Sequence, residues 1–142
     1  MLSKNFVQLF LNEFIVHLAT SSNNSPWSAP CFYIYDPFGN SLIFSSSNTT
    51  RHMQEALKNK KVAGSIANGS KEIEKIEGIQ FEGALKEATN EQKDRYYKAY
   101  PVAKSFQAPI WTVEILNAKL TKNSLGFGYK EYFNSLEMKH QA

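Results

Sequence analysis

Cysteine, arginine and long apolar runs are scarce in this sequence. The single Cys31 excludes an internal disulfide and a cysteine-based metal cluster, and it fits a reducing cytoplasm. No stretch approaches the roughly 18 apolar residues of a membrane-spanning helix. The apolar run 6–11 is interrupted by Asn12 and Glu13, and no small-residue cleavage site follows it. We therefore expect a cytoplasmic protein without a secretory signal.

Several common catalytic and binding patterns are also missing. His17, His52 and His140 do not have the spacing of metal ligands. The serines form no nucleophile elbow, and no glycine-rich phosphate loop is present. A net charge of +3 is too small for a nucleic-acid-binding surface. These absences argue against a metal site, a serine hydrolase, a P-loop nucleotidase and a nucleic-acid-binding protein.

The composition that remains is that of a globular protein. Hydrophobic residues make up 42% of the chain and charged residues 20%. A length of 142 residues predicts one domain, 1–142, with a core that needs no disulfide or metal. The aromatic content of 13% suits a β-rich fold or a pocket that packs against a flat ligand.

Hydrophobic periodicity predicts a mainly β protein with a few short helices. We expect strands at residues 14–20, 26–35, 41–45, 62–67, 72–87 and 109–120, and helices at residues 3–12, 51–59 and 89–100. Pro26 and Pro30 mark the second strand as an edge or an irregular ladder, and Gly78 and Gly83 favour bulges or sharp coiling. The dipeptide Asn68-Gly69 predicts a type I′ hairpin. Six strands joined by short turns indicate a six-stranded antiparallel barrel.

One stretch, residues 42–53, indicates a binding site. A short apolar strand leads into an unbroken run of hydroxyl and amide side chains, and a helix should begin near Thr50 or Arg51. A helix N-terminus with free N–H groups, next to Arg51 and His52, is a site for a phosphate. An ordinary N-cap in a polar loop explains the same residues. Both interpretations remain open on this stretch alone.

Four segments together resemble the FMN-binding split-barrel family, typified by pyridoxamine 5'-phosphate oxidase. These segments are residues 26–32, 42–52, 59–63 and 76–83. Within that family the chain is most similar to a small group of uncharacterised bacterial proteins, the YhbP-like subgroup. The resemblance implies a homodimer with two FMN molecules at the subunit interface. The chain departs from the family pattern at the phosphate site, where Thr50-Arg51-His52 replaces a Ser-Arg-Lys sequence. His52 is charged only part of the time at neutral pH.

The resemblance also implies the residues that contact the flavin. It assigns contacts to Ser45 and Ser46, to the Pro30–Phe32 backbone, and to a glutamine for which Gln80 is an offset match. Cys31 either lies near the flavin or fills core space, and Trp111 is either a core residue or a flavin wall from the partner. The full set of candidate cofactor-binding residues is Pro30, Cys31, Phe32, Phe44, Ser45, Ser46, Thr50, Arg51, His52, Gln80 and Trp111.

Three classes of function follow. The first is an FMN-dependent oxidoreductase, with Ala63, Ser65 and Phe44 expected to border a slot for a flat reactant. The second is a flavin-binding or sensing module without turnover. The third is a haem-binding or haem-degrading split barrel, for which only His140 in the tail offers a ligand. No arginine follows Arg95, so the second phosphate grip of pyridoxamine 5'-phosphate oxidase is missing and the sequence argues against that activity.

Overall fold

The structure, a computed structural model, describes residues 2–137 and consists of strands with short helices between them. The strands are β1 (Ile15–Ser22), β2 (Ser25–Asp36), β3 (Ser41–Ser45), β4 (Lys61–Ala67), β5 (Glu77–Glu87), β6 (Ile110–Lys122) and β7 (Lys130–Asn134). The α-helices are α1 (Lys4–Asn12), α2 (Arg51–Lys58) and α3 (Asn90–Ala99). Short 3-10 turns are η1 (Ile73–Lys75), η2 (Pro101–Phe106) and η3 (Asn123–Leu125).

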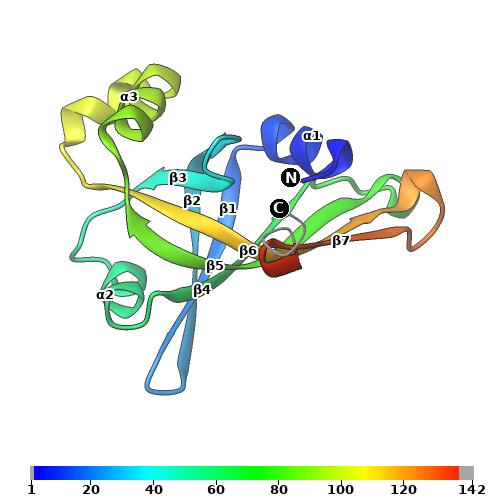
Figure 1. Cartoon of the computed structure of the whole chain (residues 1–142), viewed down its shortest axis with the longest axis horizontal. Coiled ribbons are helices and arrows are strands. Elements are labelled where there is room, and N and C mark those ends of the chain that lie inside the picture. The colour runs from blue at the N-terminus through cyan, green and yellow to red at the C-terminus, as the bar shows by residue number, and fades with distance from the viewer. Residues whose placement is uncertain (1, 138–142) are drawn as a thin grey trace.

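Six of the strands close into an antiparallel barrel. They follow the order β3-β2-β1-β4-β5-β6, and a further pairing of β3 with β6 closes the ring. The predicted six-stranded antiparallel split barrel is therefore confirmed. β7 pairs with the second half of β6, outside the ring, and lies at the end of the barrel opposite α3 (Figure 1). This seventh strand was not predicted, because its short run lacks the alternation of a strand with one buried face.

The barrel interior is filled by one face of every strand. Its largest fully buried side chains include Leu18, Tyr33, Leu42, Phe44, Ile66, Ile79, Ile115 and Leu120. Each such side chain stabilises the fold by about 1.5–3 kcal/mol through burial. Gly64 leaves room for the Phe81 ring, because a Cβ at Gly64 would lie 2.4 Å from that ring. The apolar face of α1 packs on the barrel, and the Tyr33 hydroxyl donates a hydrogen bond of 2.7 Å to the Phe10 carbonyl.

The type I′ turn lies at a different hairpin from the one predicted. Asn23 and Asn24, between β1 and β2, have φ values of 52° and 61°, as a two-residue type I′ turn requires. The prediction for Asn68-Gly69 is wrong, since the β4–β5 connection contains η1 and β5 begins only at Glu77. The Asn68 side chain bonds to the Lys75 carbonyl and the Glu77 N–H, which stabilises this longer loop.

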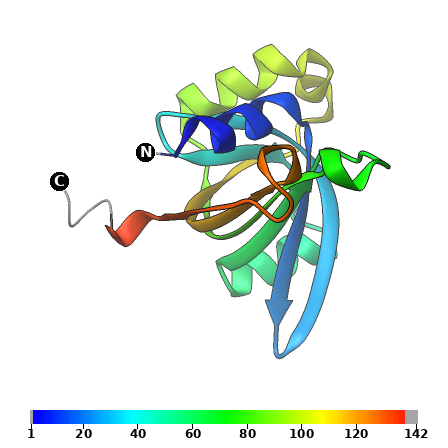
Figure 2. The ribbon, with the colours of Figure 1, turned by 90° about the vertical axis from the view of Figure 1, so that its right-hand side faces the viewer.

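The first half of β2 is an edge, as its prolines predict. Residues 25–32 pair with β1 alone, because β3 pairs only with residues 33–36. One side of this half-strand therefore has backbone polar groups without a strand partner. The β1–β2 hairpin extends past the barrel with α2 beside it (Figure 2). The predicted bulge is confirmed at Gly83, as a register shift between Glu82 and Gly83, but not at Gly78, which pairs in regular register with Ala67 and Thr121.

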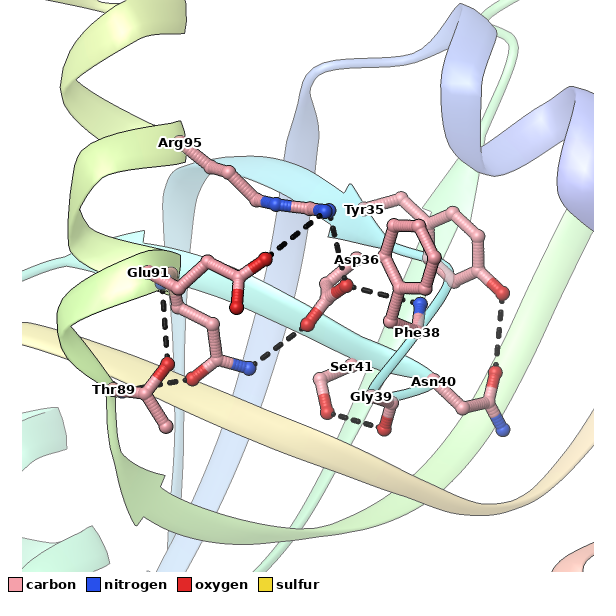
Figure 3. Close-up of polar contacts among 10 residues, drawn as sticks. Tyr35, Asp36, Phe38, Gly39, Asn40, Ser41, Thr89, Glu91 and Arg95 are labelled. Carbon is pink, nitrogen blue, oxygen red and sulfur yellow. Dashed lines mark hydrogen bonds and ion pairs between the residues drawn. The ribbon is translucent and has the colours of Figure 1, made fainter.

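α3 covers the outer face of the barrel over Ile43 and Ile110, with which Tyr96 forms a second small core. A capping box begins α3, with Thr89 and Gln92 bonded reciprocally. The buried Asp36 then fixes α3 to the end of β2 (Figure 3). Its carboxylate accepts hydrogen bonds of 2.9 Å from Gln92 Nε2 and 3.2 Å from Arg95.

Among residues 2–137, no helix combines the length and the apolar character needed to cross a membrane.

Candidate functional site

The last residue of β3 and the segment that joins it to α2, residues 45–50, form a loop that we name the hydroxyl loop. The Ser46 N–H donates to the Pro109 carbonyl, and the Trp111 indole N–H donates to the Ser46 carbonyl at 3.1 Å. Thr50 is the N-cap of α2, and its side chain accepts a hydrogen bond from the Met53 N–H. The predicted start of the helix at Arg51 is thus confirmed, and β6 holds the loop at this end of the barrel.

The side chains of the hydroxyl loop bond mainly to one another. Ser47 and Thr49 hydroxyls lie 2.9 Å apart, and Thr50 Oγ1 donates to the Ser47 carbonyl. Ser46 Oγ lies 2.7 Å from His52 Nε2. Because burial lowers the pKa of His52 below its usual value, its imidazole is neutral at neutral pH. His52 therefore acts as a hydrogen-bonding partner of Ser46, and it adds no full positive charge to the loop.

Arg51 is the cation beside the loop, and it reaches from α2 to side chains at the start of β2. Its Nε donates to Glu55 at 2.7 Å, and one terminal nitrogen donates to Ser25 Oγ at 3.1 Å. Its guanidinium carbon lies 4.0 Å from the centre of the Trp27 ring. The two hydrogen bonds use two of the five N–H donors of a guanidinium. With 46% of its side chain exposed, Arg51 is oriented by its neighbours and still open to solvent.

A cavity of about 440 Å³ opens beside the hydroxyl loop, and we name it the aromatic hollow. Phe32 and the hydroxyl loop form one wall, and α3 with η2 and the segment after it form the other. The lining residues are Phe32, Ser45, Ser46, Ser47, Tyr96, Tyr100, Val102, Ala103, Phe106 and Ala108. The structure thus brings three predicted site residues, Phe32, Ser45 and Ser46, to one cavity.

Sequence reasoning missed the α3–η2 wall of the aromatic hollow. Tyr96 and Tyr100 are four residues apart at the end of α3, so they lie on one face of the helix. Pro101 then starts η2, which presents Phe106 to the same space. The signal in the sequence was the aromatic i, i+4 pair before a proline, but nothing in the sequence indicated that this pair faces the hydroxyl loop.

Other predicted residues of β2 and β3 lie on different faces. Pro30 is exposed on the outer face, whereas Cys31 is buried, and burial raises the pKa of its thiol to about 11. Phe44 is 1% exposed, because strand alternation turns it into the barrel core. The predicted slot bordered by Phe44, Ala63 and Ser65 is therefore wrong: Ala63 and Ser65 belong to the outer face of β4.

Gln80 and Trp111 lie apart from the open part of the site. Gln80 is exposed on the outer face of β5, where it pairs with Ser65 and Lys119. Trp111 is 6% exposed and contacts the hydroxyl loop through its bond to the Ser46 carbonyl. His140 lies outside the described residues.

Comparison with other proteins identifies relatives by sequence. No family model matches the chain. A UPF0306 protein from Yersinia pestis is 35% identical over 138 residues, which cover 91% of this chain and 94% of the relative. A UPF0306 protein from Yersinia pseudotuberculosis has the same identity and coverage.

Solved structures resemble the fold. A haem-binding protein from Mycobacterium smegmatis has a TM-score of 0.74 and 13% identity, covering 96% of this chain and 60% of that one. A FAD-binding protein from Mesorhizobium loti has a TM-score of 0.70 and 13% identity, covering 84% and 94%. A candidate pyridoxamine 5'-phosphate oxidase from Listeria innocua has a TM-score of 0.68 and 14% identity, covering 84% and 96%. These likenesses show the split-barrel fold that the three proteins share with this chain.

Proposed function

The chain belongs to the UPF0306 family, and from that premise we propose that it binds FMN and acts as a flavin-dependent oxidoreductase on a small molecule. We also propose that it belongs to the YhbP-like subgroup, on the sequence segments that resemble that group. One observation carries the proposal: Arg51, the first residue of α2, bonds to Ser25 in the first half of β2, and the hydroxyl loop before α2 lines a cavity with Phe32 of the same half-strand. The same fold occurs in solved proteins that are described as FAD-binding.

The phosphate end of the site is built from α2. The first N–H groups of a helix have no partner within the helix, and the helix dipole makes this end positive. Arg51 is the cation of this end and has donors to spare, although it shares its charge with Glu55 in an ion pair, whereas His52 is neutral and bonded to Ser46. One cation and one helix end suit a single phosphate monoester, which favours FMN over the diphosphate of FAD.

The ring end of the site is the free edge of β2. On the side that β3 leaves open, residues 25–32 offer backbone C=O groups and, except at Pro26 and Pro30, N–H groups; the Phe32 carbonyl already accepts from Tyr96. Phe32, which is 56% exposed, adds an aromatic face at the end of this edge. A flavin ring has a polar pyrimidine edge and an apolar benzenoid edge, so strand backbone and Phe32 suit its two ends. When bound, the flavin would supply the hydride chemistry, and the residues of this chain would bind and orient it.

We further propose a homodimer with the flavin at the subunit interface. The outer face of β1, β2 and β4 carries small residues such as Ala19, Ala63 and Ser65, with the exposed Phe14 and Phe32 at one end. Phe14 and Phe32 stack with ring centres 6.1 Å apart. Small side chains beside exposed aromatic rings on one outer face are typical of a surface that a second copy covers.

Haem binding is the second candidate. A haem-binding protein has this fold, and His17 is exposed on the outer face of β1, where it could serve as a ligand. A flavin-binding module without turnover is the third possibility, and it shares the cofactor site with the first.

Titration of the purified protein with FMN, riboflavin, FAD and haemin, followed by absorbance and flavin fluorescence, tests the proposal. Each charge-assisted hydrogen bond to a phosphate contributes about 1.5–3 kcal/mol, so FMN should bind at least about tenfold more tightly than riboflavin. Equal affinity for riboflavin would rule out a phosphate site at α2. A Soret band with haemin that is lost in His17→Ala, without FMN binding, would replace the flavin proposal by haem binding.

A further inference from the structure

The aromatic hollow differs chemically from the phosphate end of the proposed flavin site. Six of its lining residues come from α3, η2 and the segment that follows, and these are Tyr96, Tyr100, Val102, Ala103, Phe106 and Ala108. None of the lining side chains described by the structure is charged. A phosphate or sulfonate in this space would lose water without gaining a cation, which is costly. The hollow therefore selects against anionic ligands.

The two tyrosines present their rings to the hollow and direct their hydroxyls elsewhere. Tyr96 donates to the Phe32 carbonyl at 3.4 Å, and Tyr100 donates to the Tyr33 carbonyl at 3.0 Å. Burial raises the pKa of Tyr96 to about 12, so its hydroxyl stays neutral. The rings of Tyr96 and Tyr100 lie 5.1 Å apart, and Phe32 packs against Tyr100 with ring centres 5.9 Å apart. Fixed aromatic walls of this kind suit a planar ligand.

The opposite wall of the hollow is polar but uncharged. Ser45, Ser46 and Ser47 contribute hydroxyls, and Ser46 is free to donate to a ligand in the tautomer in which His52 Nε2–H donates to Ser46 Oγ. Hydroxyl groups in an otherwise apolar space pair well with a carbonyl oxygen on the ligand. At the mouth, Phe106 is 73% exposed and Val102 is 68% exposed. A bound ligand would remove this apolar surface from water, which provides a hydrophobic driving force.

We propose that the aromatic hollow binds an uncharged, planar aromatic carbonyl compound of the quinone class. A volume of about 440 Å³ is adequate for two fused rings. The claim that this compound is a reactant rests on the proposed function, because a reactant must lie beside the flavin. The claim that the hollow binds the compound concerns only residues of this chain, and it can be measured on flavin-free protein.

Isothermal titration calorimetry of the flavin-free protein tests the inference with three matched probes. These are 2,3-dimethyl-1,4-naphthoquinone, the charged 1,4-naphthoquinone-2-sulfonate, and the hydrocarbon 2,3-dimethylnaphthalene. We expect the neutral quinone to bind at least tenfold more tightly than the sulfonate, because the walls carry no cation. We expect the hydrocarbon to bind about fivefold more weakly than the neutral quinone, because it cannot accept from the serines. Equal or tighter binding of the sulfonate would overturn the inference.

Two phenylalanine variants separate the hollow from non-specific hydrophobic binding. Phe106→Ala removes one wall of the hollow and should weaken the neutral quinone about three- to tenfold. Phe127, in the loop between η3 and β7 at the far end of the barrel, is exposed to a similar extent, 79% against 73%. Phe127→Ala should bind like the parent. Equal affinities of the two variants would refute the site.

An FMN titration of the same protein samples distinguishes this inference from the proposed function. FMN binding without quinone binding refutes the inference alone. Quinone binding without FMN binding supports the hollow and refutes the flavin proposal.

Discussion

The guanidinium carbon of Arg51 lies 4.0 Å from the centre of the Trp27 ring, so the first residue of α2 is in contact with the β1–β2 hairpin. Glu55, one turn along α2, holds the other side of this guanidinium and accepts a second bond from Thr20 on β1. The bond from Arg51 is the main reason that the pKa of Glu55 lies below its usual value. These contacts fix the orientation of the one cation of the proposed phosphate site before any ligand binds.

Arg51→Ala should weaken FMN binding by about ten- to a hundredfold, because it removes one or two charge-assisted bonds to the phosphate. Riboflavin, which has no phosphate, should bind equally to parent and variant. Titration of flavin fluorescence measures both affinities. Lys58→Ala, at the other end of α2, is the matched control for loss of one positive charge. An Arg51→Ala protein that binds FMN as tightly as the parent does would exclude Arg51 as a phosphate ligand.

Stability should depend on His52 at mildly acidic pH. Burial lowers the folded-state pKa of His52, so below about pH 6.5 the unfolded chain binds more protons than the folded one. The contribution of His52 to the free energy of unfolding is therefore constant above that pH. As the pH falls toward the folded-state pKa, protonation of His52 in the unfolded chain lowers the free energy of unfolding.

Urea denaturation between about pH 8 and pH 5 measures this effect. His52→Gln keeps an amide that can bond to Ser46, and it should show a smaller loss of unfolding free energy on acidification than the parent. Ile73→Gln, on the exposed η1, introduces a glutamine without removing a titratable group and should retain the parent's pH dependence. The same pH dependence in all three proteins would mean that His52 titrates alike in the folded and unfolded states.

Most of the barrel could be predicted from the sequence, because a closed barrel imposes a period of two on its strands. Apart from the start of β5, the predicted strands and helices agree with the observed ones to within two residues at each end. The errors fall where local chemistry was ambiguous. A type I′ turn was predicted at Asn68-Gly69, but it is formed by Asn23 and Asn24, which both adopt the left-handed conformation. Either dipeptide can adopt this conformation, so the sequence did not distinguish between them.

The candidate site was predictable only in part. The hydroxyl loop and the start of α2 are contiguous in sequence, so capping rules locate them. The aromatic hollow joins that loop to Tyr96, Tyr100 and Phe106, which lie some fifty residues further along the chain. Only the packing of α3 over Ile43 brings them together, and no local pattern encodes that contact.

Asp36 should contribute more to the free energy of unfolding than Glu91, although both contact Arg95. The Asp36 side chain is 6% exposed and accepts from Gln92 as well, whereas Glu91 is 80% exposed (Figure 3). Asp36→Asn leaves buried donors without good acceptors and should lower the unfolding free energy by about 1–3 kcal/mol. Glu91→Gln should change it by less than about 0.5 kcal/mol. Equal effects in chemical denaturation would show that α3 is not anchored through Asp36.

The proposed homodimer predicts a particle of twice the 16.1 kDa chain mass at micromolar concentration, measurable by multi-angle light scattering. Ala63→Arg places a charge on the outer face of β4 and should dissociate the dimer, because burying an unpaired cation is unfavourable. Ser70→Arg, in the exposed β4–β5 connection, should leave the mass unchanged. A parent protein of 16.1 kDa would refute the dimer.

The FMN-loaded protein should accept electrons from NADH or NADPH and should not oxidise pyridoxamine 5'-phosphate. The substrate's phosphate would need a second cationic grip beside the flavin. Arg51 is assigned to the cofactor, and Arg95, the other arginine, is bonded to the buried Asp36. The aromatic hollow, the open space next to the hydroxyl loop, has no charged lining side chain among the described residues.

Two measurements decide this last prediction. Under air, formation of pyridoxal 5'-phosphate from pyridoxamine 5'-phosphate should stay far below an ordinary enzymatic rate of about one turnover per second. A rate at or above that value would mean that lysine side chains replace the missing arginine. Under anaerobic conditions, NADH or NADPH should bleach the 450-nm absorbance typical of oxidised flavin faster than it bleaches free FMN, because the protein orients both reactants. If neither donor bleaches the bound flavin faster than free FMN, the protein is a flavin-binding module, and the contacts of Arg51 and Ser46 hold a cofactor that does not turn over.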